Sequence, residues 1–407
     1  MRRHGDDRLR RAGALSVAGG GILVATLATL WHRLARRPLP KTRGRIELPE
    51  LRGRVRVRRD RWGVPHVEAD EAEDLYFAQG FCHGQDRLFQ MDFYRRVVRG
   101  RLAEVAGEEG LPVDRLMLTL GIRRVAEREE AELEPRLREA AERFCAGVNA
   151  AARKARAMPF EMQLLKLRFE PWRPADILSL GKLLAFGLAT NWERELLRAD
   201  MARELGPELT ARLDPGYPLG NPVVDQSDWS GDGFGLVEQI DAVRRSLGLA
   251  SEASGSNNWA VSGSLSATGS PLIAGDPHLS PSMPGIWYQV GLRQGDRFAR
   301  GASLPGIPGV FIGQNNDVCW TFTNVMADTQ DLFVERVEGD RYLFEGEWRP
   351  LAVHREEIAV KGRPEPVGLE VRETHHGPLV NEPLRADAAE PLALAWQTLR
   401  EPTLFLG

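Results

Sequence analysis

The stretch Gly255-Ser256-Asn257-Asn258-Trp259-Ala260-Val261 lies where the character of the chain changes. Residues 250–255 are small and polar, which is typical of an exposed linker, whereas residues 259–261 have the apolar character of a strand. A serine that follows a glycine can attack the preceding carbonyl carbon, and an N-to-O acyl shift followed by hydrolysis would cut the chain before Ser256. The new α-amine, with a pKa of about 7.7–8.0, would then be a general base for the Ser256 hydroxyl. By spacing alone, an ordinary linker before an ordinary strand explains the same residues.

The residues on the two sides of this junction have different periodicities. Between residues 71 and 203, apolar side chains recur at three- and four-residue steps, which predicts helices. One such series is Leu137, Ala141, Phe144 and Val148. Residues 214–235 are rich in Pro, Gly and Asp, as exposed loops are, and from Asn258 onward short apolar runs separated by turn residues predict strands. We expect an α+β protein with a helical first half and a β-rich second half.

The composition is that of a soluble globular protein. The 407 residues include 54 Lys and Arg against 57 Asp and Glu, and 43% are hydrophobic. Residues 1–62 carry 17 basic against 5 acidic side chains, whereas the rest carries 37 against 52. An acidic body argues against nucleic acid as a partner. Three cysteines at unrelated spacings (Cys82, Cys145, Cys319) form neither a metal motif nor a disulfide framework.

The N-terminal segment has the pattern of an export signal. Five arginines precede an uncharged run from Ala12 to Trp31, and a second basic cluster follows it. This order predicts a secretory signal or an uncleaved membrane anchor, and the run is long enough to span a hydrocarbon core. A buried helix is the alternative. We expect residues 1–40 to direct the protein out of the cytoplasm, with the membrane as a partner only through this segment.

Several separated motifs resemble one known family. Residues 255–263 (GSNNWAVSG) and 274–279 (AGDPHL) are similar to the start of the β-subunit in the penicillin acylase family of N-terminal-nucleophile hydrolases. Residues 58–67 (RRDRWGVPHV), 74–91 (DLYFAQGFCHGQDRLFQM) and 99–104 (RGRLAE) are similar to that family's α-subunit start. Glu170-Pro171-Trp172 and His376-Gly377-Pro378 also fit. Because the motifs keep the family's order from about residue 46 to 400, the chain is identified as a member.

The resemblance implies an inactive precursor whose two chains form a four-layer αββα sandwich around one active site. Residues 41–236 would be the α-chain region, residues 237–255 a spacer, and residues 256–407 the start of the β-chain. The autocleavage site would be Gly255-Ser256. The implied reaction is hydrolysis of an N-acyl amide, in which Ser256 forms an acyl-enzyme that water then releases.

The same resemblance assigns further catalytic groups. The backbone N–H of Asn324 matches the family's main-chain oxyanion donor, and the second donor is an asparagine side chain much farther downstream. The sequence ends at Gly407, so either the chain is a fragment or it lacks a complete oxyanion hole, and we expect no activity from these 407 residues alone. His278 occupies a position where some members have a histidine that contacts the serine, and imidazole suits proton transfer near pH 7. The structural alternative is a histidine that hydrogen-bonds the turn at Asp276-Pro277.

Four residues match the calcium site of several family members: Glu195, Asp328, Gln330 through its carbonyl, and Asp331. Oxygen ligands suit Ca²⁺, which would hold the two chains together without a catalytic role. No organic cofactor is expected. Without the resemblance, an Asp-x-x-Asp pair is only a solvated turn.

The resemblance also places six residues at the acyl pocket: Trp192 as a gate, and Leu279, Ile286, Ile312, Phe322 and Val325. They predict an apolar acyl group, although such side chains equally form sheet cores. Leu279 and Ile312 replace aromatic residues of benzyl-binding members, which leaves acyl-homoserine lactones, lipopeptides and other N-acyl amides open as small-molecule substrates.

Two alternatives remain at this stage. In a conventional serine hydrolase, His278 would be the base for an internal Ser256, but the sequence has no G-x-S-x-G elbow. In a non-catalytic, membrane-anchored scaffold or fragment, the acylase fold would be kept without its activity. Chain cleavage distinguishes these alternatives, because only the N-terminal-nucleophile mechanism requires it.

Overall fold

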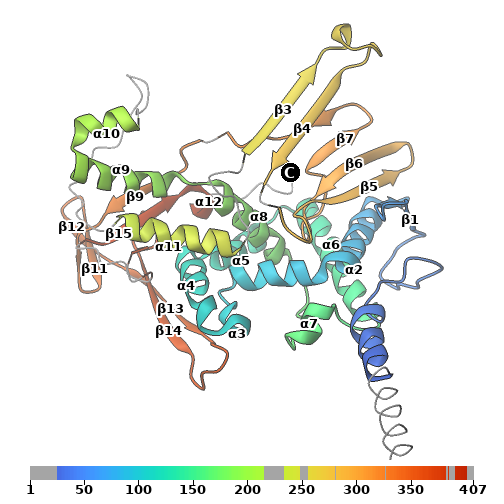
Figure 1. Cartoon of the computed structure of the whole chain (residues 1–407), viewed down its shortest axis with the longest axis horizontal. Coiled ribbons are helices and arrows are strands. Elements are labelled where there is room, and N and C mark those ends of the chain that lie inside the picture. The colour runs from blue at the N-terminus through green and yellow to red at the C-terminus, as the bar shows by residue number, and fades with distance from the viewer. Residues whose placement is uncertain are drawn as a thin grey trace, which may run out of the picture.

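The structure, a computed structural model, describes residues 25–214, 233–247, 255–279, 281–325, 327–381, 384 and 390–400. Its first half is mainly helical and its second half is rich in strands, so the expected α+β class is confirmed (Figure 1). The helices are η1 (His32–Arg36), α2 (Ala72–Val98), α3 (Ala103–Ala106), η2 (Gly107–Gly110), α4 (Leu111–Leu120), α5 (Ile122–Glu132), α6 (Pro135–Lys154), α7 (Phe160–Leu164), α8 (Pro174–Leu188), α9 (Asn191–Leu205), α10 (Pro207–Leu213), α11 (Gly233–Ser246), η3 (Gly263–Leu265) and α12 (Gln397–Arg400). The strands are β1 (Arg56–Arg59), β2 (Pro65–Glu68), β3 (Gly255–Val261), β4 (Leu272–His278), β5 (Tyr288–Gln294), β6 (Arg297–Ser303), β7 (Ile312–Asn315), β8 (Cys319–Trp320), β9 (Gln330–Val334), β10 (Val337–Glu338), β11 (Arg341–Phe344), β12 (Glu347–Pro350), β13 (Ala352–Ile358), β14 (Val367–Glu373) and β15 (Leu392–Trp396).

One six-stranded sheet joins the two halves of the sequence. Its strand order is β1-β2-β5-β6-β7-β8, and the parallel pair β2–β5 brings His66 opposite Gly291. Buried side chains from this sheet and from α2 form one cluster: Val67, Ala78, Cys82, Tyr288 and Val290. Because two strands from the first half complete a sheet of the second half, the two regions fold as one body.

Helices α2 and α6 pack at unusually short range behind this sheet. A Cβ added to Gly80 would lie 2.0 Å from the carbonyl oxygen of Phe144, and one added to Gly147 would lie 1.9 Å from that of Phe77. Only glycine allows the two backbones to approach this closely. The glycine at position 80 of the 74–91 motif is therefore explained by helix packing.

The arginine-rich motif at residues 99–104 is part of an ion-pair network. Arg99 and Arg101 contact the Glu170 carboxylate at 3.0 and 2.7 Å, and Arg99 also contacts Asp176 at 2.7 Å. These contacts tie the end of α2 to the loop before α8. Two of the motifs that carry the family resemblance are thus joined across about seventy residues of sequence.

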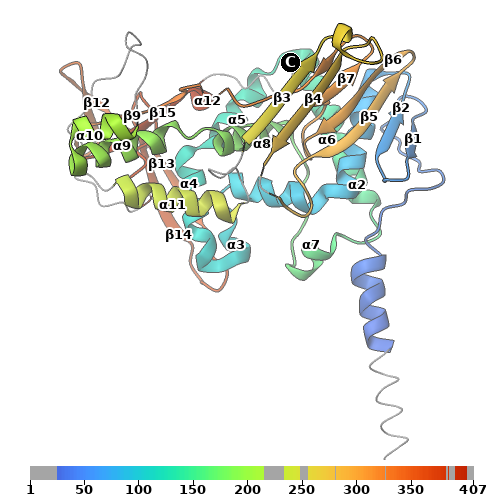
Figure 2. The same ribbon diagram turned by 45° about the horizontal axis from the view of Figure 1, so that its top comes forward.

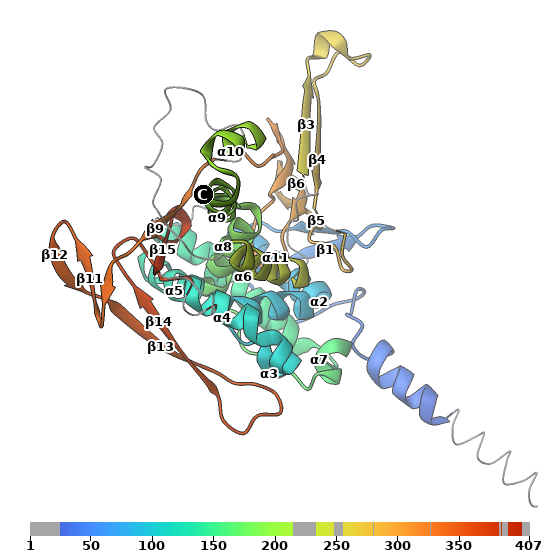
Figure 3. The same cartoon turned by 60° about the vertical axis from the view of Figure 1, so that its left-hand side comes forward.

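The β3–β4 hairpin, which contains Ser256, forms a separate two-stranded sheet that projects from the body (Figure 3). Strand β3 begins four residues earlier, and strand β4 ends four residues later, than the apolar runs alone predicted. Cross-strand pairing continues to Gly255 in β3 and to His278 in β4. Trp259 is 67% exposed and Leu272 55% exposed. Trp259 and Leu272 lie on one face of this hairpin and Ile273, which is 43% exposed, lies on the other, so both faces carry exposed apolar side chains.

Two predicted boundaries can be compared with the structure. Helix α11 crosses the predicted junction at Val237 and extends into the region expected to be spacer. Residues 25–36 are helical and stand away from the body (Figure 2), whereas the rest of the predicted leader run lies outside the described residues. Within the described part of the chain, no helix is both long and apolar enough to cross a membrane.

Candidate active site and adjacent carboxylate cluster

Ser256 is the second residue of β3 and lies at the base of the projecting hairpin. Its partner across the strand pair is Pro277, and Gly255 is paired with His278. Both Gly255 and Ser256 are half-buried. The predicted cleavage junction is therefore held in extended conformation by strand pairing immediately beside His278.

The imidazole of His278 faces the Gly255 side of this junction. A Cβ added to Gly255 would lie 2.6 Å from His278 Nε2, and His278 Nδ1 lies 3.1 Å from the carbonyl oxygen of Asp276. Successive side chains of a strand point to opposite faces, so Ser256 points away from the face that His278 shares with Gly255. This geometry argues against His278 as the base for an internal Ser256, and it includes the turn contact expected from the structural alternative.

The segment that contains Asn324 connects the hairpin to the helical half. Thr321 Oγ1 lies 3.1 Å from Asn258 Oδ1 of β3, and the Asn324 side chain donates to the carbonyl oxygen of Leu188 at 2.9 Å. Leu188 is the last residue of α8. Asn324 is thereby fixed between the hairpin and the α8–α9 junction, while its assignment as oxyanion donor stays a prediction.

The structure does not gather the six predicted acyl-pocket residues into one cavity. Phe322 and Val325 are 56% and 82% exposed, Leu279 and Ile312 are half-buried, and Ile286 packs against the α2–α6 core. Trp192 is fully buried in the helical core, so a gate role would require its indole to become accessible. A cavity of about 180 Å³ lies elsewhere, beside Arg58, His66 and Arg300, and none of the six residues lines it.

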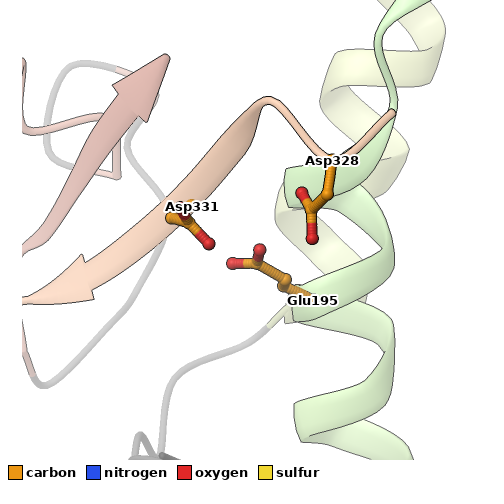
Figure 4. Close-up of side chains that lie close together, drawn as sticks. All are labelled: Glu195, Asp328 and Asp331. Atoms are coloured by element: carbon orange, nitrogen blue, oxygen red, sulfur yellow. The ribbon is translucent and has the colours of Figure 1, made fainter. Parts of the chain in front are cut away.

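Three of the four predicted metal ligands do come together. The carboxylates of Glu195 on α9, Asp331 on β9 and Asp328 just before it each offer an oxygen within 4.8 Å of the others (Figure 4). Burial is the main reason why the pKa of Glu195 is raised to about 7, with Asp331 and Asp328 adding to the rise. Burial and Asp328 also raise the pKa of Asp331. Three mutually repelling carboxylates, of which Glu195 and Asp331 are partly buried and Asp328 is exposed, fit a divalent hard cation such as Ca²⁺.

The fourth predicted ligand, Gln330, lies between the two aspartates and is buried. Its side-chain oxygen accepts from the backbone N–H of Asn191 at 3.2 Å. The Asn191 side chain in turn accepts from the N–H of Thr329 at 3.4 Å, and Glu195 accepts from the N–H of Leu332 at 2.9 Å. The start of α9 and the start of β9 are thus cross-linked around the carboxylates. The role of Asn191 in this cross-link was not predicted, and its position at the first residue of a helix is the signal that could have suggested it.

Comparison with known proteins places these features in a family. The family model described as penicillin amidase matches residues 54–406. The chain belongs to the penicillin amidase family. This agrees with the resemblance carried by the sequence motifs and with the N-terminal-nucleophile hydrolase fold class.

Curated relatives are similar over most of this chain. The acyl-homoserine lactone acylase QuiP of Pseudomonas aeruginosa is 36% identical, over 88% of this chain and 44% of that protein. The penicillin acylase 2 proenzyme of Pseudomonas sp. strain SE83 is 35% identical, over 89% of this chain and 47% of that protein. The thermostable penicillin G acylase structure from Alcaligenes faecalis is 28% identical, covers 43% of this chain and 97% of that one, and has a TM-score of 0.36. The chain spans about half the length of the curated relatives it matches.

Proposed function

We propose that this protein is an N-acyl amide hydrolase made as a self-cleaving precursor, with Ser256 as the N-terminal nucleophile after cleavage. The observation that supports this most is the Gly255-Ser256 junction at the very start of β3 in a member of the penicillin amidase family. The Ser256 oxygen would attack the amide carbon, the amine would leave with a proton, and water would release the acid from the acyl-enzyme.

The base for this reaction is the α-amine that cleavage creates. Before cleavage, the Ser256 nitrogen is an amide and cannot accept a proton, which explains why the uncut chain would be inactive. His278 lies on the Gly255 side of the junction, so during the cut its imidazole would donate a proton to the Ser256 nitrogen as that nitrogen leaves, and would not act as the base for the Ser256 hydroxyl. Because Ser256 and His278 point to opposite faces of the hairpin, we favour the amine over His278 as the base in the mature enzyme.

The backbone N–H of Asn324 is our candidate for one oxyanion donor. Removal of such a donor typically costs about 2.7–4 kcal/mol in transition-state stabilisation. The family resemblance implies a second donor from an asparagine side chain in the part of the relatives that this chain does not match. Full activity would therefore require polypeptide that corresponds to that part, together with a cover for the exposed β3–β4 hairpin.

The substrate class we propose is a small N-acyl amide with an apolar acyl group. The relatives are named for acyl-homoserine lactones and penicillin, whose cleaved bonds are both amides of a carboxylic acid. Leu279, Phe322 and Val325 offer apolar side chains in the segments before and after the sheet, and Ile312 is the first residue of β7 within it. Aliphatic side chains at Leu279 and Ile312 favour an alkyl chain over a benzyl group.

A structural Ca²⁺ at Glu195, Asp328 and Asp331, with the Gln330 carbonyl as a further ligand, completes the proposal. The ion would stabilise the ionised form of Glu195, which burial and the neighbouring aspartates disfavour, and would hold the α-chain helix α9 against the β-chain strand β9. The N-terminal basic and apolar pattern supports export, so we propose that the enzyme acts outside the cytoplasm.

Intact-mass measurement of the purified chain tests the precursor mechanism. A fragment that begins Ser-Asn-Asn-Trp should appear from the unmutated protein and be missing from Ser256→Ala. Ser264→Ala is the matched control, because Ser264 also follows a glycine and lies in the η3 turn at the hairpin tip. It should be cut as efficiently as the unmutated protein.

An activity screen should follow with N-acyl homoserine lactones of graded acyl length and with penicillin G. The screen is run with the processed chain alone and with an added polypeptide that covers the unmatched half of the relatives. Release of the free acid only by protein with an intact Ser256 supports the assignment. Processing without hydrolysis of any N-acyl amide in either arm would favour the non-catalytic scaffold.

A further inference from the structure

Helix α11 is built into the helical core through its apolar face. Leu236 and Ile240 are fully buried, and Val243 and Leu247 are each 4% exposed. All four belong to the cluster that contains Trp192 and Leu196 of α9, together with Met117 and Leu120 of α4. The helix packs against both α9 and α4. Each such side chain contributes about 1.5–3 kcal/mol by leaving water, so α11 is held firmly.

A buried polar anchor adds to this packing. The side chain of Arg244 is 3% exposed and lies 2.7 Å from the Glu193 carboxylate of α9. Arg244 Nη2 also donates to the carbonyl oxygen of Ala189 at 2.6 Å, and the guanidinium lies 4.6 Å from the ring centre of Phe186. Without α11, Glu193 would lose its ion-pair partner and the side chains that pack beside it.

The first residue of α11, Gly233, also lies in close contact with α9. A Cβ added to Gly233 would lie 2.7 Å from Asp200 Oδ2 and 2.8 Å from the carbonyl oxygen of Leu196. Glycine therefore allows the helix to begin directly against the α9 backbone. Close contact at the first turn, the apolar face and Arg244 together attach α11 along its length.

We infer that residues 233–247 stay in the mature enzyme as part of its helical core and are not removed with the spacer. This inference rests on the proposed processing before Ser256, and it revises the expected spacer limits of residues 237–255. Removal of α11 would empty a site lined by Trp192, Leu196 and Glu193. These three residues lie within one helical turn of Glu195 on α9, so the loss of α11 would also disturb the proposed calcium ligands.

The first experiment is denaturing intact mass of the processed, natively purified full chain, followed by peptide mapping. We expect residues 233–247 to co-purify in stoichiometric amount with the fragment that begins at Ser256. Their loss from a chain that is cut before Ser256 would overturn the inference while leaving the proposed function intact. A chain that is never cut would instead overturn the proposed function.

A second experiment tests the packing of α11 in the uncut Ser256→Ala chain, so it does not depend on processing. Native trypsin should leave the bonds after Arg244 and Arg245 intact until the core opens. Arg244→Gln should speed cutting after Arg245 by at least about tenfold, because it removes the buried anchor.

The matched control for this variant is Arg245→Lys, which keeps a trypsin site at an exposed position of the same helix. It should leave the cutting rate unchanged, and Arg244→Lys should restore part of the protection. Early cutting in α11 of the parent chain, or equal rates for Arg244→Gln and the parent chain, would contradict a permanent place for α11 in the core.

Discussion

The substitution Glu195→Gln should change the sign of its effect on stability when calcium is added. Glu195 is partly buried, and its pKa rises to about 7 from an ordinary value of 4.5. Because the folded protein binds this proton more tightly than the unfolded chain, metal-free stability should fall as pH rises from 4.5 to 7. At pH 8 the ionised carboxylate then costs about 3 kcal/mol.

Replacement by glutamine removes this cost in the metal-free protein. The amide oxygen can still accept from the N–H of Leu332, which now donates to the carboxylate at 2.9 Å, but the bond is weaker by about 1 kcal/mol. Glu195→Gln should therefore stabilise the metal-free protein by about 2 kcal/mol at pH 8. Calcium at one hundred times its Kd should stabilise the parent protein by about 2.7 kcal/mol and the variant far less.

Thermal and urea unfolding at pH 8, with EDTA or with excess Ca²⁺, measures both effects. Glu109→Gln is a matched control, because Glu109 is exposed and lies on η2, an element outside the carboxylate cluster. It should respond to calcium as the parent does. Destabilisation by Glu195→Gln in EDTA, or an equal calcium shift in both proteins, would refute the assignment of this cluster.

Three further predictions concern other parts of the fold. Gly147→Ala should lower the free energy of unfolding by about 2–3 kcal/mol despite its better helix propensity, because the new Cβ would meet the Phe77 carbonyl oxygen at 1.9 Å; Gly368→Ala, where nothing lies within 4 Å, should have little effect in the same urea titration. His278→Ala should slow the appearance of the Ser256 N-terminus by about 100-fold without changing the melting temperature; an unchanged time course on denaturing gels would remove His278 from the mechanism. Arg101 is the main partner that lowers the pKa of Glu170 against the opposing effect of burial, so the stability that this pair adds should be present above pH 4.5 and be lost progressively as pH falls below it; Glu170→Gln should then destabilise at pH 7 and by less at each lower pH in an acid series, and an effect that does not change with pH would contradict the ion pair's role.

Local patterns in the sequence predicted the class of the fold, whereas the carboxylate cluster was predicted only through the family resemblance. Helical and strand periodicities were visible in single segments, but Asp328 and Asp331 alone would be only a solvated turn, and the family resemblance supplied Glu195 as their partner. The cluster then formed in the structure from α9 and β9. Its cross-link through Asn191 was not predicted, because the position of Asn191 at the start of a helix does not identify a hydrogen-bond partner more than one hundred positions away.

Other features could not be read from the sequence because long-range packing decides them. Helix α11 follows a loop-like, Pro- and Gly-rich stretch, and only its burial against α9 and α4 reveals it as core. Trp192 was predicted as a pocket gate from its family position, whereas the structure packs it inside the helical core. An apolar side chain fits a core and a pocket equally well by sequence, so the acyl-pocket residues stay predictions.

The most direct test of the account is the N-terminal sequence and intact mass of the chain after purification, compared with Ser256→Ala. The account predicts two fragments from the parent protein, of which one begins at Ser256, and a single uncut chain from the variant. A folded parent protein that stays uncut, or a variant that is cut at the same bond, would contradict the claim that Ser256 cleaves its own precursor and becomes the nucleophile.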